Sequence, residues 1–253
     1  MKKHKICKIL LVMLAIFLCV AFYELLGICV AYKKQPEVSN TTKKETKNGS
    51  WNECSENTER AVIIEKNPEA LLQRVRLIKN AKKEIILSTF AFQSDESGKL
   101  ILGALHDAAD RGVHIRLLVD GMESWIDMEG NPYFYGLSSH ENVEIKLYNK
   151  ANPLKPWKMM GRMHDKYLIA DGKRYILGGR NTYNYFLGDF PGHKNYDRDV
   201  LVVCDEPEKE NSVNQLSEYF ETIWNQEDSS YFHNNKKLAN RKSVKNAVLE
   251  LQN

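Results

Sequence analysis

Cysteine is scarce in this chain and is not spaced for zinc. The five cysteines among 253 residues are Cys7, Cys19, Cys29, Cys54 and Cys204. The first three lie in or beside a hydrophobic segment, and no two have the short spacing typical of structural zinc sites. In an oxidising compartment Cys54 and Cys204 could form a disulfide, or they remain two free thiols; the sequence leaves both alternatives open.

A basic excess is missing outside the N-terminal fifth. The formal charge is +3, from 36 basic and 33 acidic residues. Residues 1–50 hold nine lysines and three glutamates, which leaves 27 basic and 30 acidic residues and a net charge of −3 for the remainder. Domains that bind long nucleic acids normally carry an excess of basic residues. The net charge of −3 therefore argues against a domain of this kind.

A long hydrophobic run is present at the N-terminus. It covers residues 9–32, about 24 residues, and is interrupted only by Glu24 and Gly27. This length is sufficient for a helix to cross a bilayer. It exceeds the apolar stretch of a cleavable signal peptide, and no small-residue cleavage site follows. Residues 1–32 are therefore predicted to form an uncleaved signal anchor rather than a cleaved signal sequence.

Charges flanking this run indicate an orientation. Four lysines, Lys2, Lys3, Lys5 and Lys8, precede it, and two, Lys33 and Lys34, follow it. The positive-inside rule then places the N-terminus in the cytoplasm and the globular part outside, as a single-pass membrane protein. Composition predicts a polar linker over residues 33–60, a globular domain over 61–230 and a polar, helical tail over 231–253.

Hydrophobic periodicity predicts an α/β fold. Helices are expected over residues 67–81, 99–111 and 212–224, the first capped by Asn67. Strands are expected over residues 84–92, 113–120, 143–148, 163–170, 174–177 and 200–204. The strand–helix–strand order predicts a mixed, largely parallel sheet with helices on both faces.

One segment brings together polar side chains that could take part in catalysis. His164 and Lys166 are two residues apart, so a strand would present both on one face. Gly178 and Gly179 end the next strand and allow close approach of backbone or ligand, with Asn181 just beyond. A nitrogen nucleophile, a cation and an amide donor suit a phosphate diester, whereas a lone His-x-Lys would be ordinary polar residues at a sheet end.

The spacing of these residues follows the pattern His-x-Lys-x4-Asp-x6-Gly-Gly-x-Asn, from His164 through Asp171 to Asn181. It resembles the HKD motif of the phospholipase D superfamily, and the similarity extends over residues 61–225. The resemblance implies a phospholipase D-like α-β-α domain, similar to the N-terminal half of a cardiolipin synthase. The motif is specific for the superfamily and says little about the substrate.

The resemblance also implies roles. His164 would attack phosphorus and form a phosphohistidine, while Lys166 and Asn181 would bind the non-bridging oxygens. Asp171 is expected to fix the loop and strand geometry rather than to contact substrate. Asp199, or alternatively Asp197, would orient a histidine ring. No metal and no cofactor is implied.

The chain departs from the family in containing one motif where the family builds its site from two. Either a homodimer or a missing second half would complete the site.

The leading hypothesis is a membrane-anchored enzyme that hydrolyses phospholipids or transfers a phosphatidyl group. A metal-independent endonuclease and a catalytically idle binding half-domain are the alternatives.

Residues around the motif have two interpretations. The basic residues could form a solvated face, or they could attract phosphate head groups or nucleic acid; they are Lys150, Lys155, Lys158, Arg162, Lys166, Lys173, Arg174 and Arg180. Trp157 and Met159-Met160 could form an apolar lip for acyl chains or pack in the core.

Overall fold

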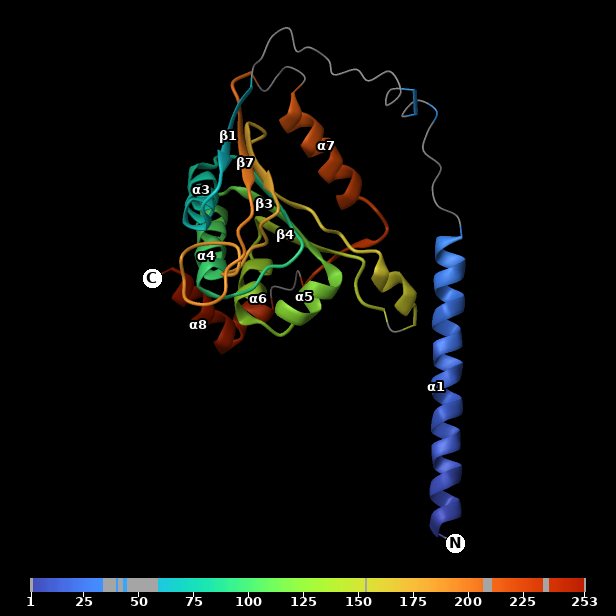
Figure 1. Ribbon diagram of the computed structural model, residues 1–253. Helices are drawn as coiled ribbons and strands as arrows, with labels where there is room; N and C mark the ends of the chain where they lie inside the picture. Colours follow the sequence, from blue (N-terminus) through green and yellow to red (C-terminus); the bar gives the residue numbers. More distant parts are fainter. Residues whose placement is uncertain are drawn as a thin grey trace. The chain divides into compact units, whose positions relative to one another are not determined.

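The computed structural model describes residues 2–33, 40, 43–44, 59–152, 154–206, 211–233 and 237–252. The chain divides into two units, Met1–Ser55 with Ala151–Gly161, and Glu56–Lys150 with Arg162–Asn253 (Figure 1). Most of the predicted linker lies outside the described residues. Cys54 does too, so both alternatives for Cys54 and the buried Cys204, a disulfide or two free thiols, stay open.

The first unit contains the long N-terminal helix α1, Lys2–Tyr32. Its stretch His4–Val30 is long and apolar enough to cross a membrane by length and composition. The predicted hydrophobic helix is therefore confirmed as a helix. The unit also contains the 3-10 helix η1, Pro156–Met160.

The second unit is built on an eight-stranded sheet in the order β1-β7-β6-β5-β2-β3-β4-β8. The strands are β1 Glu59–Ile64, β2 Glu84–Thr89, β3 His114–Asp120, β4 Val143–Tyr148, β5 Lys166–Ala170, β6 Arg174–Gly178, β7 Asp199–Cys204 and β8 Ser229–Tyr231. Mixed pairing is confirmed, but "largely parallel" is wrong. Only β2 with β3 and β3 with β4 pair in parallel, and the other five described pairings are antiparallel.

The connections between strands explain this mixture. A parallel pair needs a crossover, which α4 supplies between β2 and β3, and α5 with α6 between β3 and β4. A three-residue turn joins β5 to β6, and such a short turn forces an antiparallel hairpin. The apolar runs of parallel and antiparallel strands look alike in the sequence, so composition alone did not distinguish the two directions of pairing.

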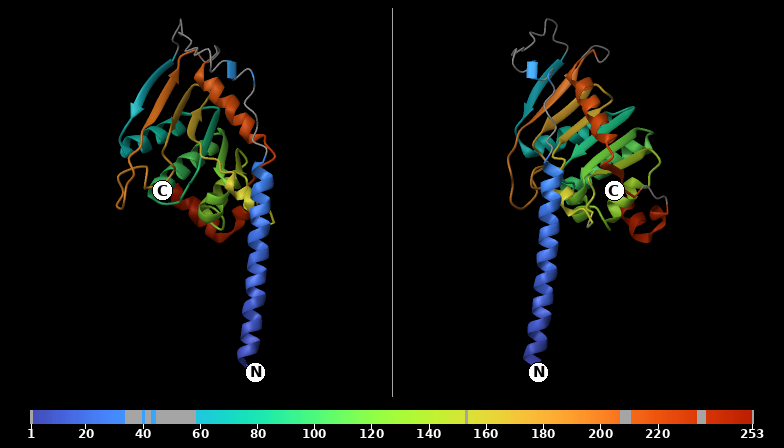
Figure 2. Two further views of the ribbon diagram at one scale, coloured as in Figure 1. Left: turned by 45° about the vertical axis from the view of Figure 1, so that its right-hand side comes forward. Right: turned by 90° about the vertical axis from the view of Figure 1, so that its right-hand side faces the viewer.

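Helices cover both faces of the sheet, as predicted (Figures 1 and 2). The helices are α3 Asn67–Asn80, α4 Glu96–Asp110, α5 Gly121–Asp127, α6 Pro132–Ser138, α7 Ser212–Trp224 and α8 Lys242–Leu251. Side chains of α3, α4, α6 and α8 share one core with Leu87 and Leu168, and α7 shares a second core with Ile86 and Tyr167. Neighbouring strand residues thus enter opposite cores, as the two-residue repeat of a strand requires.

Capping residues and apolar periodicity in the sequence located most helix and strand boundaries. Two helix starts differ from the prediction. Asn67 does not cap α3; Lys66 is the N-cap, without a side-chain bond. Instead Asn67 is buried, and its Nδ2 donates to the Asn195 carbonyl. Helix α4 begins at Glu96 rather than residue 99, because the Asp95 carboxylate accepts from the Gly98 backbone N–H.

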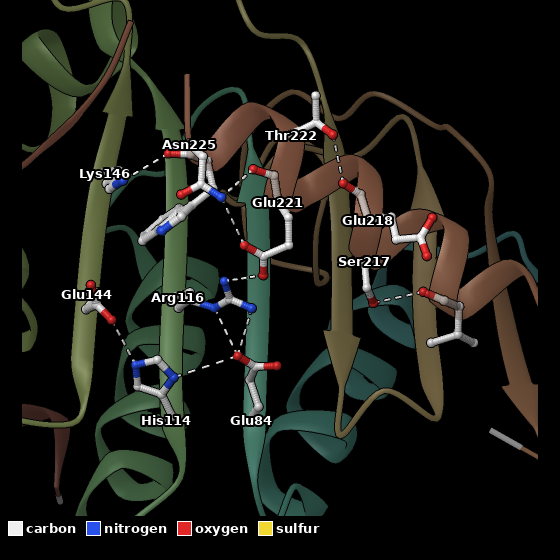
Figure 3. A network of polar contacts seen from close by, with 12 residues as sticks. Glu84, His114, Arg116, Glu144, Lys146, Ser217, Glu218, Glu221, Thr222 and Asn225 are labelled. Carbon is white, nitrogen blue, oxygen red and sulfur yellow. Dashed lines mark hydrogen bonds and ion pairs between the residues drawn. The ribbon is translucent and has the colours of Figure 1, made fainter. Parts of the chain in front are cut away.

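A polar network fastens α7 to the sheet (Figure 3). Arg116 on β3 pairs with Glu84 on β2 and with Glu221 on α7. Lys146 on β4 donates to the carbonyl of Trp224 at the end of α7. These contacts orient the helix that covers the face opposite α3 and α4.

Candidate active site

His164 and Lys166 lie together at one end of β5. The strand begins at Lys166 rather than at residue 163, so His164 belongs to the extended segment that precedes it. Lys166 is buried, and its Nζ donates to the backbone carbonyl of His164 at 2.7 Å. The His164 side chain is exposed. The Lys166 side chain is therefore bonded directly to the His164 backbone, although only Lys166 lies within the regular strand.

A ring that the sequence did not single out sits between these groups. Phe90 follows β2, and its ring centroid lies 4.6 Å from that of His164 in an edge-to-face arrangement. The Lys166 ammonium lies 5.3 Å from the same centroid, and the Arg162 guanidinium 4.9 Å. Attraction between cations and the ring face holds this group together.

Asp120 fixes the backbone that carries His164. Its side chain is buried at the end of β3, and one oxygen accepts from Nε and Nη2 of Arg162 at 2.9 and 2.6 Å. The other oxygen accepts from the Met163 backbone N–H at 3.1 Å. The same carboxylate caps α5 through the N–H groups of Met122 and Glu123. The two residues before His164 are thus anchored by one carboxylate.

The electrostatics of the cluster favour a neutral imidazole. Partial desolvation of the largely exposed ring, followed by the charge of Lys166, lowers the pKa of His164 below its usual value, and Arg162 acts in the same direction. Burial also lowers the pKa of Lys166, which Asp165 and Asp197 partly oppose. A neutral ring at neutral pH is the form that can act as a nucleophile.

Strand register aligns further site residues with Lys166. Thr89 stands opposite Lys166 on β2, and Gly178 on β6 stands opposite Asp199 on β7. A Cβ at Gly178 would collide with the Asp199 carboxylate, and one at Gly179 with the Asp197 carboxylate. The two glycines therefore make room for acidic side chains of the protein itself.

Asp199 is held by two arginines. Its Oδ2 lies 2.8 Å from Nη1 of Arg74 and 3.2 Å from Nη1 of Arg180, and all three side chains are buried. Among the described residues, neither ring nitrogen of His164 has a hydrogen-bond partner in Asp199 or elsewhere. Asp197, rather than Asp199, joins Asp165 as a carboxylate whose charge acts on Lys166.

Asn181 reaches the same end of the sheet. It is buried, and its Oδ1 accepts from the Ala91 backbone N–H at 3.3 Å, just beyond β2. The next residue, Thr182, bonds the Thr89 hydroxyl at 3.2 Å. With its oxygen engaged, the Asn181 amide keeps Nδ2 as a donor.

Asp171 lies at the opposite end of β5. Its φ of 55° is in the left-handed region, and its carboxylate accepts from the backbone N–H groups of Lys82, Lys83 and Glu84. These bonds tie the β5–β6 turn to the start of β2. Asp171 therefore organises the loop and is separated from His164 by the length of the strand.

Comparison with known proteins places this arrangement in a family. The model of the family described as cardiolipin synthase, PLD-like domain, matches residues 74–224. The chain belongs to this family.

Related proteins share the PLD-like domain and are longer. An uncharacterized protein of Helicobacter pylori (strain ATCC 700392 / 26695) is 34% identical over 141 residues, covering 51% of this chain and 28% of its own. Cardiolipin synthase C of Escherichia coli (strain K12) is 30% identical over 154 residues, covering 55% and 31%. The chain thus matches less than a third of the length of these relatives.

Solved structures share the fold of the PLD-like domain. Phosphatidylserine synthase of Haemophilus influenzae Rd KW20 superposes with a TM-score of 0.54 at 17% sequence identity, covering 84% of this chain and 47% of that one. At this identity the likeness concerns the fold.

Within the described residues, no group of three or more His, Cys, Asp or Glu side chains is placed to hold a metal ion.

The position of Arg162 predicts a pH effect in this PLD-like domain. A nucleophilic His164 is active when neutral, so activity is present above its pKa and is lost as pH falls through it. Because Arg162 lowers that pKa, Arg162→Met should move the acidic limb of the kcat/KM profile to higher pH. Arg60→Met, at an exposed arginine paired with Asp205, is the matched control. An unmoved or lowered limb in Arg162→Met would contradict this account.

Proposed function

We propose that this chain is a phosphodiester hydrolase or phosphatidyltransferase that acts on phospholipids through a phosphohistidine. The observation that carries the proposal is the cluster at the start of β5. There an exposed imidazole with a lowered pKa adjoins a buried lysine, and Asp120 holds the backbone just before the imidazole through Arg162 and the Met163 N–H. This combination supplies a nucleophile and a positive charge at one point.

The proposed reaction has two steps. Nε2 or Nδ1 of His164 attacks phosphorus, a P–N bond forms, and the P–O bond to the leaving alcohol breaks as a second histidine donates a proton to that oxygen. Water or an acceptor alcohol then attacks phosphorus, loses its proton to the second histidine, and releases His164. Lys166 and the Asn181 amide would stabilise the non-bridging oxygens, where negative charge increases in the transition state.

The second histidine is proposed to come from another copy of the motif. This chain carries the pattern once, and a two-fold arrangement of identical chains would place two copies of His164 about one phosphate. A second half-domain would serve equally, and the greater length of the matched relatives is consistent with that source. Asp197, which is partly exposed, would then orient the ring of the second histidine, because Asp199 is buried and held by Arg74 and Arg180.

Phospholipid is the favoured substrate class for two reasons. Helix α1 has the length and apolarity of a membrane anchor, and anchoring raises the effective concentration of a lipid substrate. Two of the similar proteins are named as a cardiolipin synthase and a phosphatidylserine synthase. We propose that α1 is retained as a signal anchor, with the PLD-like domain outside the cytoplasm.

The endonuclease alternative is weakened by the net charge of −3 outside residues 1–50, and two of the arginines near the motif are occupied within the fold. Arg180 is buried and bonds Asn67 and the Ile64 carbonyl, so it is internal to the fold. Arg162 is paired with Asp120 and Glu123. These two arginines are therefore engaged by the protein itself, whereas Lys150, Lys155, Lys158, Lys173 and Arg174 are exposed.

A substrate assay with the full chain tests the proposal. In the presence of EDTA, we expect turnover of phosphatidylglycerol vesicles, because the mechanism uses a nitrogen nucleophile and protein cations. Plasmid DNA should remain intact under the same conditions. Cleavage of DNA without lipid turnover would establish the nuclease instead, and strict dependence on Mg²⁺ or Zn²⁺ would refute the proposed chemistry.

A further inference from the structure

Helix α1 makes specific contacts with the segment that leads to the motif. The Tyr23 hydroxyl donates to the Leu154 carbonyl at 2.8 Å. The rings of Tyr23 and Trp157 meet edge to face, with centroids 5.1 Å apart. Gly27 lies one turn further, and a Cβ there would collide with the Trp157 ring. Both partners belong to the same unit of the structure.

These contacts lie near the C-terminal end of α1. The 27-residue stretch His4–Val30 is about 40 Å long as a helix, more than the roughly 30 Å of a bilayer hydrocarbon core. Tyr23 and Gly27 therefore fall near the interface opposite the lysine-rich N-terminus. Tyrosine and tryptophan are enriched at that depth, where an apolar ring meets polar head groups.

The composition of the segment also suits a lipid interface. Leu154 and Met160 are exposed by 77% and 69%, so two large apolar side chains of this segment are free to contact lipid. Lys155 lies between Leu154 and Trp157 and is exposed as well. Apolar side chains interspersed with lysine are typical of elements that lie in the head-group region of anionic membranes.

We propose that residues 154–161 form a membrane-interface element that docks on α1, with Trp157 seated at Gly27, and that contacts phospholipid head groups. Only Arg162 and Met163 separate this segment from His164. The anchor would thus deliver bilayer lipid to the site in addition to tethering the domain. The inference rests on the proposed phospholipid substrate.

A cysteine pair tests the docking itself. In a chain whose native cysteines are replaced by serine, Gly27→Cys with Trp157→Cys should form an intrachain disulfide in membranes, since the contact brings the two Cβ positions close together. The control pair is Ala15→Cys with Trp157→Cys, because Ala15 lies three turns away on α1. Crosslinking no greater than in the control pair would overturn the docking.

Two substrates test the functional part. Gly27→Leu should lower turnover of phosphatidylglycerol vesicles, on the order of tenfold from lost effective concentration, while leaving turnover of water-soluble bis(p-nitrophenyl) phosphate unchanged. Ala15→Leu should affect neither. Equal vesicle activity in the two variants would overturn the delivery role. Wild type inactive on both substrates would instead defeat the proposed function, and the crosslink would still decide the docking.

Discussion

We expect His164→Asn to remove phosphodiester turnover and to leave the fold intact. The side chain is exposed, and its recorded contact is with the Phe90 ring, so little packing is lost. Without the ring nitrogen no phosphohistidine forms, and loss of a catalytic nucleophile lowers kcat by about 10⁴-fold or more. An exposed substitution should change the free energy of unfolding by about 0.5 kcal/mol or less.

The measurement pairs an initial-rate assay with a thermal melt. His193→Asn is the control, because His193 is also exposed and beside an aromatic ring, Tyr185, but lies outside the motif. We expect this control to retain wild-type turnover. Substantial activity in His164→Asn with an unchanged melt would remove His164 from the mechanism.

Mixing inactive and wild-type chains should reduce activity more steeply than dilution. If two copies of His164 share one phosphate, a mixed dimer has a nucleophile or a proton donor but not both. At equal amounts of His164→Asn and wild type, only about one quarter of freely exchanging dimers keep both imidazoles, so about one quarter of the activity should remain.

This experiment separates the sources of the second histidine. Mass measurement of the active species accompanies the titration. Activity that falls in proportion to the wild-type fraction, from a species of monomeric mass, would contradict the shared site. An inactive monomer that gains activity when a second motif-bearing domain is supplied would assign the second histidine to another half-domain.

Local patterns predicted the groups that lie close together in the chain. His164 and Lys166 were found because their spacing is part of a motif, and the boundaries of β4 and α7 were found because apolar periodicity is local. The residues that hold the site were not found. Asp120 accepts hydrogen bonds from Arg162 and Met163, which lie more than 40 residues further along the chain. No sequence spacing predicts a contact over that distance.

Tertiary contacts also overrode rules that hold for isolated segments. Asn67 before Pro68 is a typical helix start, yet its amide is drawn into the core by Arg180 and the Asn195 carbonyl. Arg180 was grouped with surface cations because the sequence does not show that Asp199 and Asn67 would surround it. The three residues between the predicted strands 163–170 and 174–177 already required an antiparallel pair, whereas apolar composition does not give the direction of strands joined by longer connections.

The pairing of β1 with β7 has a consequence for biosynthesis. β1 is an edge strand in the sheet order, and Val62 and Ile63 stay exposed even in the folded chain. Its partner begins at Asp199, opposite Ile64, so β1 leaves the ribosome on the order of ten seconds before β7 exists. An unpaired apolar strand is a template for aggregation. A nascent chain arrested before β7 would therefore display that unpaired strand, which chaperones that recognise exposed apolar segments could bind.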